Sequence, residues 1–240
     1  MDYLGVDGCP QGWFVIKIDS NGNLRWHLVE RLIEITLPIK PYHAFIDMPI
    51  GLNRAGSTRK CDVLLRSQLP RLLKSSVFSP PVEEAVFADT YREACEINQR
   101  ITGKKISKQA WNITPRIREL NRFLECGKQS ECWHESHPEL FFQRLNNDVA
   151  LTFKKKQKQG VEERLAILKM CFSSVDVFFY SILQSTLRKH LKADDILDAM
   201  VLAIGAYLYY PDGIDYFPDA EIVNYVGLRQ QIVAPKKSHS

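Results

Sequence analysis

Carboxylates in short, separated motifs are the residues of this chain whose types and spacing could do chemistry. Asp7 in GVDG, Asp47 in FIDMP and Glu135 in HESHPE each lie at or just beyond an apolar run that is typical of a strand. Asp195 and Asp198 in DDILDAM lie one turn apart on an apolar helical segment. Carboxylates at the edge of a core are costly unless a positive group joins them. The pattern therefore predicts a shared site for divalent metal ions.

Oxygen ligands of this kind favour Mg²⁺ or Mn²⁺ over softer metals. A pair of such ions about 4 Å apart can activate a water molecule and stabilise the leaving oxygen of a phosphodiester. The chemistry indicated is metal-dependent hydrolysis of phosphodiesters.

Each carboxylate also has a structural explanation. Asp7 precedes a glycine and could form a turn, and Asp47 could close a strand before a proline. Asp194 or Asp195 could cap the last helix, which is worth about 1 kcal/mol. Asp198 lies inside the apolar run ILDAMVLAIGA, where a charge needs a partner or a metal.

The elements that must position these residues follow from the apolar periodicity. Asn21-Gly22 is a hairpin signal, Ser79-Pro80-Pro81 breaks a long helical region, and Pro138 is placed to open a helix. The expected strands are 2–6, 13–18, 24–29, 43–47 and 131–136, and the expected helical regions are 58–125, 138–145, 161–172, 176–191 and 195–209. This order indicates an α/β protein with a sheet of mixed direction. If the first, fourth and fifth strands are parallel neighbours, their carboxylates converge on one rim.

Composition and charge narrow the class of protein. The 240 residues are 45% hydrophobic and 25% charged, which is ordinary for a globular protein. No secretory signal pattern and no membrane-spanning stretch are visible, so a cytoplasmic protein without membrane association is expected. Residues 54–128 hold 15 Lys or Arg against 8 Asp or Glu, a balance of +7 that leaves −3 for the rest of the +4 total. This distribution suits a phosphate-bearing partner and equally a solvated helical surface.

Three further residues could bind substrate. Arg59 and Arg66 are seven apart on one helix face, where they could clamp phosphates or pair with Asp62 and nearby acids. His137 could assist proton transfer beside Glu135, or it could be a hydrogen-bonded histidine next to a proline turn.

Two other clusters favour ordinary structural roles. Lys155 and Lys156 could contact a substrate, but a charge run of this kind is typical of a solvated surface. Cysteines and histidines within 126–137 could suggest zinc, but their spacing is not that of a zinc module. The six cysteines form no C-x-x-C pair, and reduced thiols are expected.

The motifs together resemble the domain of unknown function 429 family. The resemblance rests on motifs that occur in order along nearly the whole chain: GVDGCPQGW, IDMPIGL, RKCDVLLR, SVFSPP, YREACEIN, TG, SKQ, ITPRIRE, ESHPE and DDILDAM. It implies a ribonuclease H-like fold and a nuclease activity whose substrate is not established.

The resemblance also implies roles for the carboxylates. In the wider ribonuclease H-like superfamily, an Asp of the first strand, an acid of the fourth and acids of a late helix bind the metals. By this likeness Asp7, Asp47, Asp195 and Asp198 are the expected metal ligands, and Glu135 is a further ligand or bridging group. The implied architecture is a single domain, residues 1–240, in which helices flank a mixed five-stranded sheet. Residues of about 54–128 form a mostly helical insertion.

The function expected from these observations is a metal-dependent nuclease or other phosphodiesterase. A second possibility is a non-catalytic nucleic-acid-binding or scaffold protein on the same fold. An actin-like kinase is a third, but the chain has no second lobe and no second glycine-rich phosphate loop.

Overall fold

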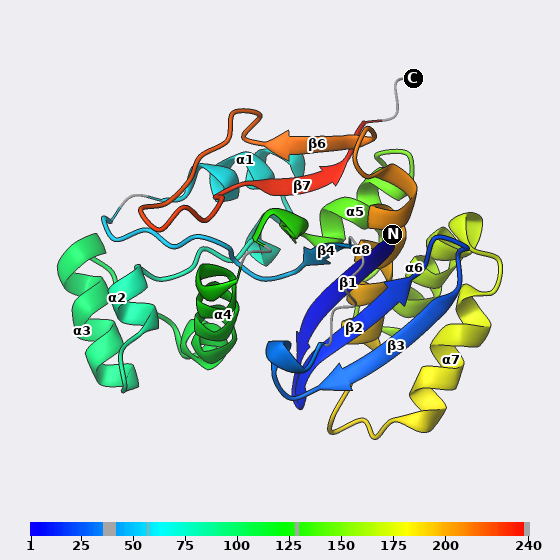
Figure 1. The fold of residues 1–240 in the computed structure, drawn as a ribbon, viewed down its shortest axis with the longest axis horizontal. Helices are drawn as coiled ribbons and strands as arrows, with labels where there is room; N and C mark the ends of the chain where they lie inside the picture. Colours follow the sequence, from blue (N-terminus) through cyan, green and yellow to red (C-terminus); the bar gives the residue numbers. More distant parts are fainter. Residues whose placement is uncertain (36–41, 57, 128–129, 238–240) are drawn as a thin grey trace. The chain divides into compact units, whose positions relative to one another are not determined.

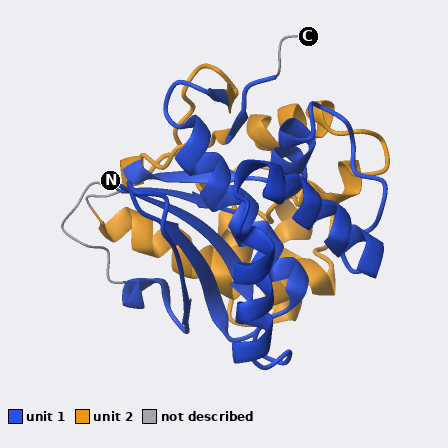
Figure 2. Ribbon diagram, turned by 90° about the vertical axis from the view of Figure 1, so that its right-hand side faces the viewer, with its two compact units in different colours: residues 1–47, 132–215, 233–240 blue, residues 48–131, 216–232 orange. Residues whose placement is uncertain are grey.

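The chain forms two compact units. The structure, a computed structural model, describes residues 1–35, 42–56, 58–127 and 130–237 (Figure 1). Unit 1 comprises residues 1–47, 132–215 and 233–240, and unit 2 comprises residues 48–131 and 216–232 (Figure 2). The five predicted catalytic carboxylates belong to unit 1. The predicted insertion, 54–128, lies in unit 2, and its positions 57 and 128 are outside the described residues.

An α/β architecture with a seven-stranded mixed sheet is present. The strands are β1 (Asp2–Cys9), β2 (Gly12–Ile18), β3 (Leu24–Val29), β4 (Tyr42–Ile46), β5 (Trp133–Ser136), β6 (Ile214–Phe217) and β7 (Ile232–Pro235). Their order in the sheet is β3-β2-β1-β4-β5-β7-β6. The first five match the predicted strands, whereas β6 and β7 were not predicted.

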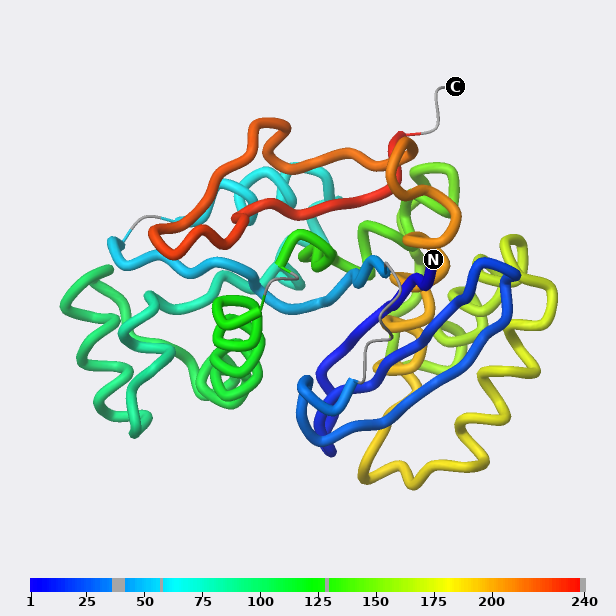
Figure 3. The backbone as a smooth tube through the Cα atoms, viewed as in Figure 1, coloured from blue at the N-terminus to red at the C-terminus, as the bar shows by residue number. Residues whose placement is uncertain are grey.

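Two hairpins build the first part of the sheet, and its path can be followed in Figure 3. β1 pairs with β2 antiparallel up to Cys9 and Gly12, so the connecting turn is Pro10-Gln11. Between β2 and β3, Gly22 has a φ of 80°, and the side chain of Asp19 accepts a hydrogen bond from the Asn21 amide at 2.9 Å. The hairpin predicted at Asn21-Gly22 is confirmed.

The next strands are parallel. β1 pairs with β4, and β4 pairs with β5, both in parallel register. The amide of Asp47 donates to the Val6 carbonyl at 3.1 Å, which extends the β1–β4 pairing one residue beyond β4. The condition on which the convergence of their carboxylates depended, parallel pairing of the first with the fourth and of the fourth with the fifth strand, is therefore met.

Among the residues that the structure describes, the α-helices of unit 1 are α5 (Pro138–Leu145), α6 (Lys158–Cys171), α7 (Val175–Ser185) and α8 (Ala193–Tyr209). Pro138 opens α5 as predicted. α8 is buried from Ile196 to Ala206 and packs against β1, β2 and β4 (Figure 1). This helix therefore forms the centre of the core of unit 1.

Unit 2 contains α1 (Lys60–Gln68), α2 (Glu83–Val86), α3 (Tyr91–Thr102) and α4 (Lys108–Cys126). Gly103 ends α3 with a φ of 77°, and the Ser107 hydroxyl caps α4 by accepting from the Ala110 amide at 3.0 Å. Glycine with a positive φ after a helix and serine at the start of one are the residues that these positions favour. Over the parts of the chain that are described, no helix is both long enough and apolar enough to cross a membrane.

Candidate functional site

Asp7 and Asp47 lie side by side on one face of the sheet. Val6 and Ile46 are register partners in the parallel β1–β4 pair, so the following residues, Asp7 and Asp47, are level with each other. Level residues on neighbouring strands project to the same face. Asp7 lies inside β1 and opposite Phe14 of β2, so it belongs to the strand ladder and not to the turn that was its structural alternative.

Asp198 reaches this face from α8. A Cβ added at Gly5 would meet the backbone of α8 at Ala199 and Ala203, which shows that Gly5 faces the helix. Asp7 is two residues further along β1 and projects to the same side. Asp198 is 1% exposed, and its Oδ1 atom is buried with no hydrogen-bond partner among the described residues. α8 thus brings a third carboxylate to Asp7 and Asp47.

The pKa values of the three carboxylates are raised by burial and by neighbouring charges. Burial first, and then the charges of Asp47 and Asp198, raises the pKa of Asp7 well above its ordinary value. Burial and the charge of Asp198 raise the pKa of Asp47 to about 7. Burial also raises the pKa of Asp198, although Lys155 opposes the shift. Like charges that share a buried site make each ionisation harder. We name Asp7, Asp47 and Asp198 the carboxylate cluster.

Asp195 lies at the margin of this cluster. Its Oδ2 atom accepts a hydrogen bond from the backbone N–H of Lys192 at 3.0 Å, which ties it to the start of α8. Burial raises the pKa of Asp195 to about 6, against the effect of this bond. Asp195 thus takes part in the cap as the third residue of α8, but the N-cap itself is Lys192 and neither Asp194 nor Asp195. The charge of Asp198 raises the pKa of Asp7 more than that of Asp195 does.

Glu135 projects to the other face of the sheet. It is level with Ile46, one position before the level of Asp47, and alternation along a strand sends the two side chains in opposite directions. Glu135 is 6% exposed, and its charge is one of the smaller contributions that raise the pKa of Asp47. Its predicted role as a ligand or bridging group remains a prediction.

Lys155 is the residue that sequence reasoning undervalued. Its Nζ atom lies 2.6 Å from Oδ2 of Asp198. Burial disfavours its charge, but Asp198 and Asp7 outweigh that effect and raise the pKa of Lys155. Lys156, by contrast, is exposed. Only Lys156 fits the solvated charge run expected from the sequence.

A second, fixed ion pair lies beside the cluster. Arg164 of α6 donates from Nη2 to both carboxylate oxygens of Glu139, at 2.7 and 2.8 Å. The charge of Glu139 helps to raise the pKa values of Asp47 and Asp198. The sequence signal was available, because Glu139 is a single acid in the apolar helical segment PELFF and a buried charge needs a partner.

The two predicted phosphate-binding arginines belong to unit 2, where their guanidinium groups contact the protein itself. Arg59 is 3% exposed and donates to both oxygens of Asp62, at 2.6 and 3.3 Å, so the ion-pair alternative is confirmed for it. Arg66 donates to the Val77 carbonyl at 2.9 Å and to the Ser79 hydroxyl at 2.7 Å.

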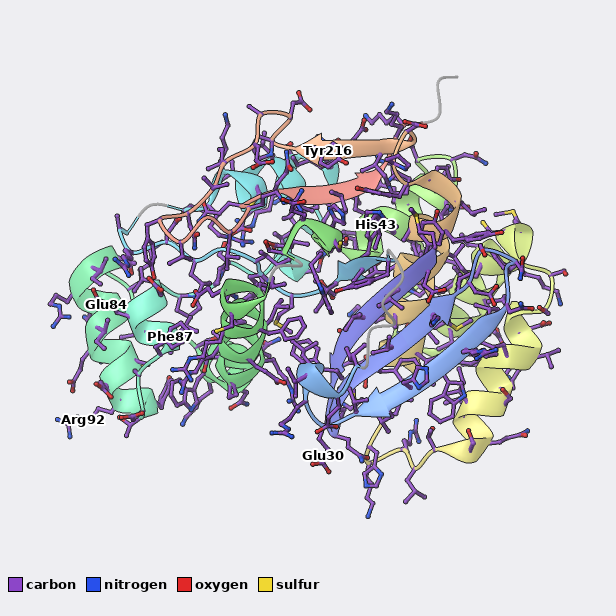
Figure 4. The ribbon with its side chains drawn as sticks, in the orientation of Figure 1. Glu30, His43, Glu84, Phe87, Arg92 and Tyr216 are labelled. Carbon is purple, nitrogen blue, oxygen red and sulfur yellow. The ribbon has the colours of Figure 1, made fainter. Side chains whose placement is uncertain are left out.

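The histidines near β5 are buried among rings and at a helix start. His137 is 8% exposed and immediately precedes α5, and its predicted role in proton transfer remains a prediction. His134 packs against Tyr210 with ring centroids 5.0 Å apart. His43 of β4, labelled in Figure 4, packs against the same tyrosine at 4.0 Å. These contacts place His43 and His134 in a ring cluster of the core of unit 1.

The carboxylate cluster has the donor chemistry of a divalent-cation site. Its donors are hard oxygens suited to Mg²⁺ or Mn²⁺, and the Oδ1 atom of Asp198 lacks a hydrogen-bond partner. Within the described residues, however, no three His, Cys, Asp or Glu side chains stand close enough together to hold a metal ion as they are. The residue types fit such an ion, but their carboxylate oxygens would have to move closer together to bind it.

The chain is an α/β protein that carries Asp7 on β1, Asp47 directly after β4 and Asp198 on α8. The family model described as "Protein of unknown function (DUF429)" matches residues 5–222. The chain therefore belongs to the DUF429 family, as the motifs indicated. Searches of curated proteins and of solved structures gave no match.

The raised pKa values predict that stability without metal falls as pH rises. The folded protein raises the pKa of Asp47 from 3.8 to about 7, so this group stabilises the fold fully below about pH 4 and loses that contribution as pH rises through about 7. Asp195 shifts in the same direction. In urea denaturation with EDTA, Asp47→Asn should therefore gain stability relative to wild type between about pH 5 and pH 8. A difference that stays constant with pH would contradict the prediction.

Proposed function

We propose that this protein is a metal-dependent phosphodiesterase, and specifically a nuclease, on a ribonuclease H-like fold. The observation that carries the proposal is the meeting of Asp7, Asp47 and Asp198 on one face of unit 1. Burial raises the pKa values of all three, the charges of Asp47 and Asp198 add to the shift of Asp7, and the charge of Asp198 adds to that of Asp47. Perturbed carboxylates clustered in this way are typical of functional sites. A first-strand acid, a fourth-strand acid and a late-helix acid are also the set that the resemblance implies.

The roles of the residues follow from their positions. Asp7 on β1, Asp47 after β4 and Asp198 on α8 would hold Mg²⁺ or Mn²⁺ through carboxylate oxygens, with Asp195 at the margin. When bound, such ions supply an activated water and stabilise the charge of a leaving oxygen. The strand ladder and the buried helix fix the three carboxylates from different directions. Lys155 offsets part of their negative charge.

The proposal predicts that Mn²⁺ stabilises the protein and supports cleavage. At 100 times the dissociation constant the ion would contribute about 2.7 kcal/mol, which corresponds to roughly 5 to 10 °C in a domain of this size. Differential scanning fluorimetry should show this rise, and EDTA should abolish it. The same preparation should cleave labelled DNA or RNA, single-stranded or duplex, only with Mg²⁺ or Mn²⁺.

Matched variants make the test specific. Asp47→Asn should lose the thermal response to Mn²⁺, whereas Asp194→Asn, which removes the same charge from the start of α8, should keep it. The proposal fails if Mn²⁺ neither stabilises wild type nor supports hydrolysis of any phosphodiester tested.

A non-catalytic nucleic-acid-binding protein is the second candidate. One observation favours it: the described carboxylates do not stand as preformed metal ligands. This candidate predicts salt-dependent binding of nucleic acid with no turnover at any metal concentration. Binding that survives in Asp47→Asn while no product forms with wild type would select it.

A further inference from the structure

We propose that Lys155 is an internal cation that occupies the cation position beside Asp198 until a divalent ion displaces it. The proposal rests on the proposed metal site and adds the device that competes with the metal. Its first support is the ion pair itself, in which Lys155 Nζ and Asp198 Oδ2 are 2.6 Å apart. The ammonium also lies close enough to Asp7 and Asp47 for their charges to act on it.

The backbone that carries Lys155 is held firmly against α6. The amides of Thr152 and Phe153 donate to the carboxylate of Glu163 at 2.8 and 3.0 Å. A Cβ at Gly160 would stand 2.1 Å from the Lys154 carbonyl oxygen, so only glycine lets the segment lie so close to the helix. The placement of Lys155 is therefore built into the fold and is not the chance position of a surface side chain.

The side chain of Lys155 can leave without moving that backbone. It is 37% exposed, whereas its partner Asp198 is 2% exposed. A lysine has a flexible four-carbon stem and a strongly hydrated head, so rotation of the side chain moves the ammonium from its ion pair into water, where its hydration replaces the lost contact. The backbone of Lys155 is thus held in place, while its side chain can rotate and its ammonium can exchange with another cation.

Arg164 shows the contrast. Its side chain is 2% exposed and binds both oxygens of Glu139, and it also donates to the carbonyls of Phe153 and Gly160 at 3.2 and 3.1 Å. A guanidinium held in this way cannot leave without unpairing several buried groups. Of these two cations beside the cluster, Lys155 is the one that can exchange with a metal ion.

Competition for Asp198 has a reciprocal consequence. If the metal must displace the ammonium, then the ammonium weakens metal binding by the same factor by which the metal weakens the ion pair. Removal of the ammonium should therefore strengthen metal binding and lower the stability of the metal-free protein. A lysine that only supported the fold, or that helped to hold the metal, would not produce these two opposite effects together.

The test compares Lys155→Met with Lys156→Met, because methionine keeps most of the stem and removes the charge. Isothermal titration calorimetry with MnCl₂ alone should give roughly tenfold tighter binding to Lys155→Met than to wild type, within the usual range of such couplings. Its metal-free melting temperature should be lower than that of wild type. Lys156→Met should match wild type in both measurements.

The outcomes separate this proposal from the proposed function. The competition is overturned if Lys155→Met binds Mn²⁺ no more tightly than wild type does. The metal site itself still stands in that case if wild type binds Mn²⁺ and Asp198→Asn does not. Absence of Mn²⁺ binding from both wild type and Lys155→Met overturns both. Binding that is detectable only in Lys155→Met supports the competition, because it shows that the ammonium excludes the ion.

Discussion

Asp7→Asn should abolish metal-dependent cleavage while it stabilises the metal-free protein. Burial, Asp47 and Asp198 all disfavour the ionised form of Asp7, so a neutral amide of the same shape removes an electrostatic cost. Loss of partners that only orient metal ligands already costs about 10- to 100-fold, and loss of a ligand should therefore reduce the cleavage rate more than about 100-fold. Urea denaturation in EDTA near pH 8 and a cleavage assay with Mn²⁺ measure the two effects.

Asp2→Asn is the matched control on the same strand. Asp2 pairs with Lys17 at 2.5 Å and lies at the far end of β1 from Asp7. Its substitution should leave both cleavage and the thermal response to Mn²⁺ intact. Cleavage by Asp7→Asn at the wild-type rate would remove Asp7 from the proposed site. Destabilisation of Asp7→Asn in EDTA would show that its carboxylate serves the fold.

Opposite effects on stability and activity are expected where a site stores unfavourable charge. The cluster holds three carboxylates on one face of the sheet, with Lys155 as a partial counterion. The buried helix α8 places Asp198 against the sheet. A protein that needed only stability would place apolar side chains at these positions. Carboxylates at these positions are what the proposed metal site requires.

The fold could be predicted where local pattern and tertiary structure agree. The five strands with clear apolar runs were found, whereas β6 and β7 were missed. Each of these two has four residues, IDYF and IVAP, which is too short for an alternation signal. The end of β1 was placed at residue 6, because Asp7 before Gly8 could form a turn. Pairing with β2 extends the strand to Cys9.

The site could be predicted only in part because its geometry depends on register. Strand ends and helix spacing found Asp7, Asp47 and Asp198, but the face to which Glu135 projects depends on the pairing of β4 with β5. Lys155 stands in a run of charges, and nothing local distinguishes it from Lys156. Its partner is 43 residues away, and only the folded chain brings the two together.

Gly5 sets the distance between β1 and α8, the two elements that carry Asp7 and Asp198. A Cβ at this position would stand 2.0 Å from the Ala199 carbonyl oxygen and 2.3 Å from the Ala203 nitrogen. Both atoms are helix backbone and cannot rotate away. Gly5 is two residues before Asp7, and Ala199 directly follows Asp198. The close approach at Gly5 is therefore also the approach that brings the two carboxylates together.

Gly5→Ala should lower the free energy of unfolding by at least about 3 kcal/mol, at the upper end of the cost of overpacking. It should also weaken Mn²⁺ binding, because the displaced α8 carries Asp198 away from Asp7. Gly205→Ala on the same helix is the comparison, since its added Cβ would meet the ring of Phe141 at 2.4 Å and a side chain can shift more readily than backbone. Urea denaturation and calorimetry on both variants should show the larger loss of stability and of Mn²⁺ binding for Gly5→Ala. Equal Mn²⁺ affinity in Gly5→Ala and wild type would show that the contact between Gly5 and α8 does not control metal binding.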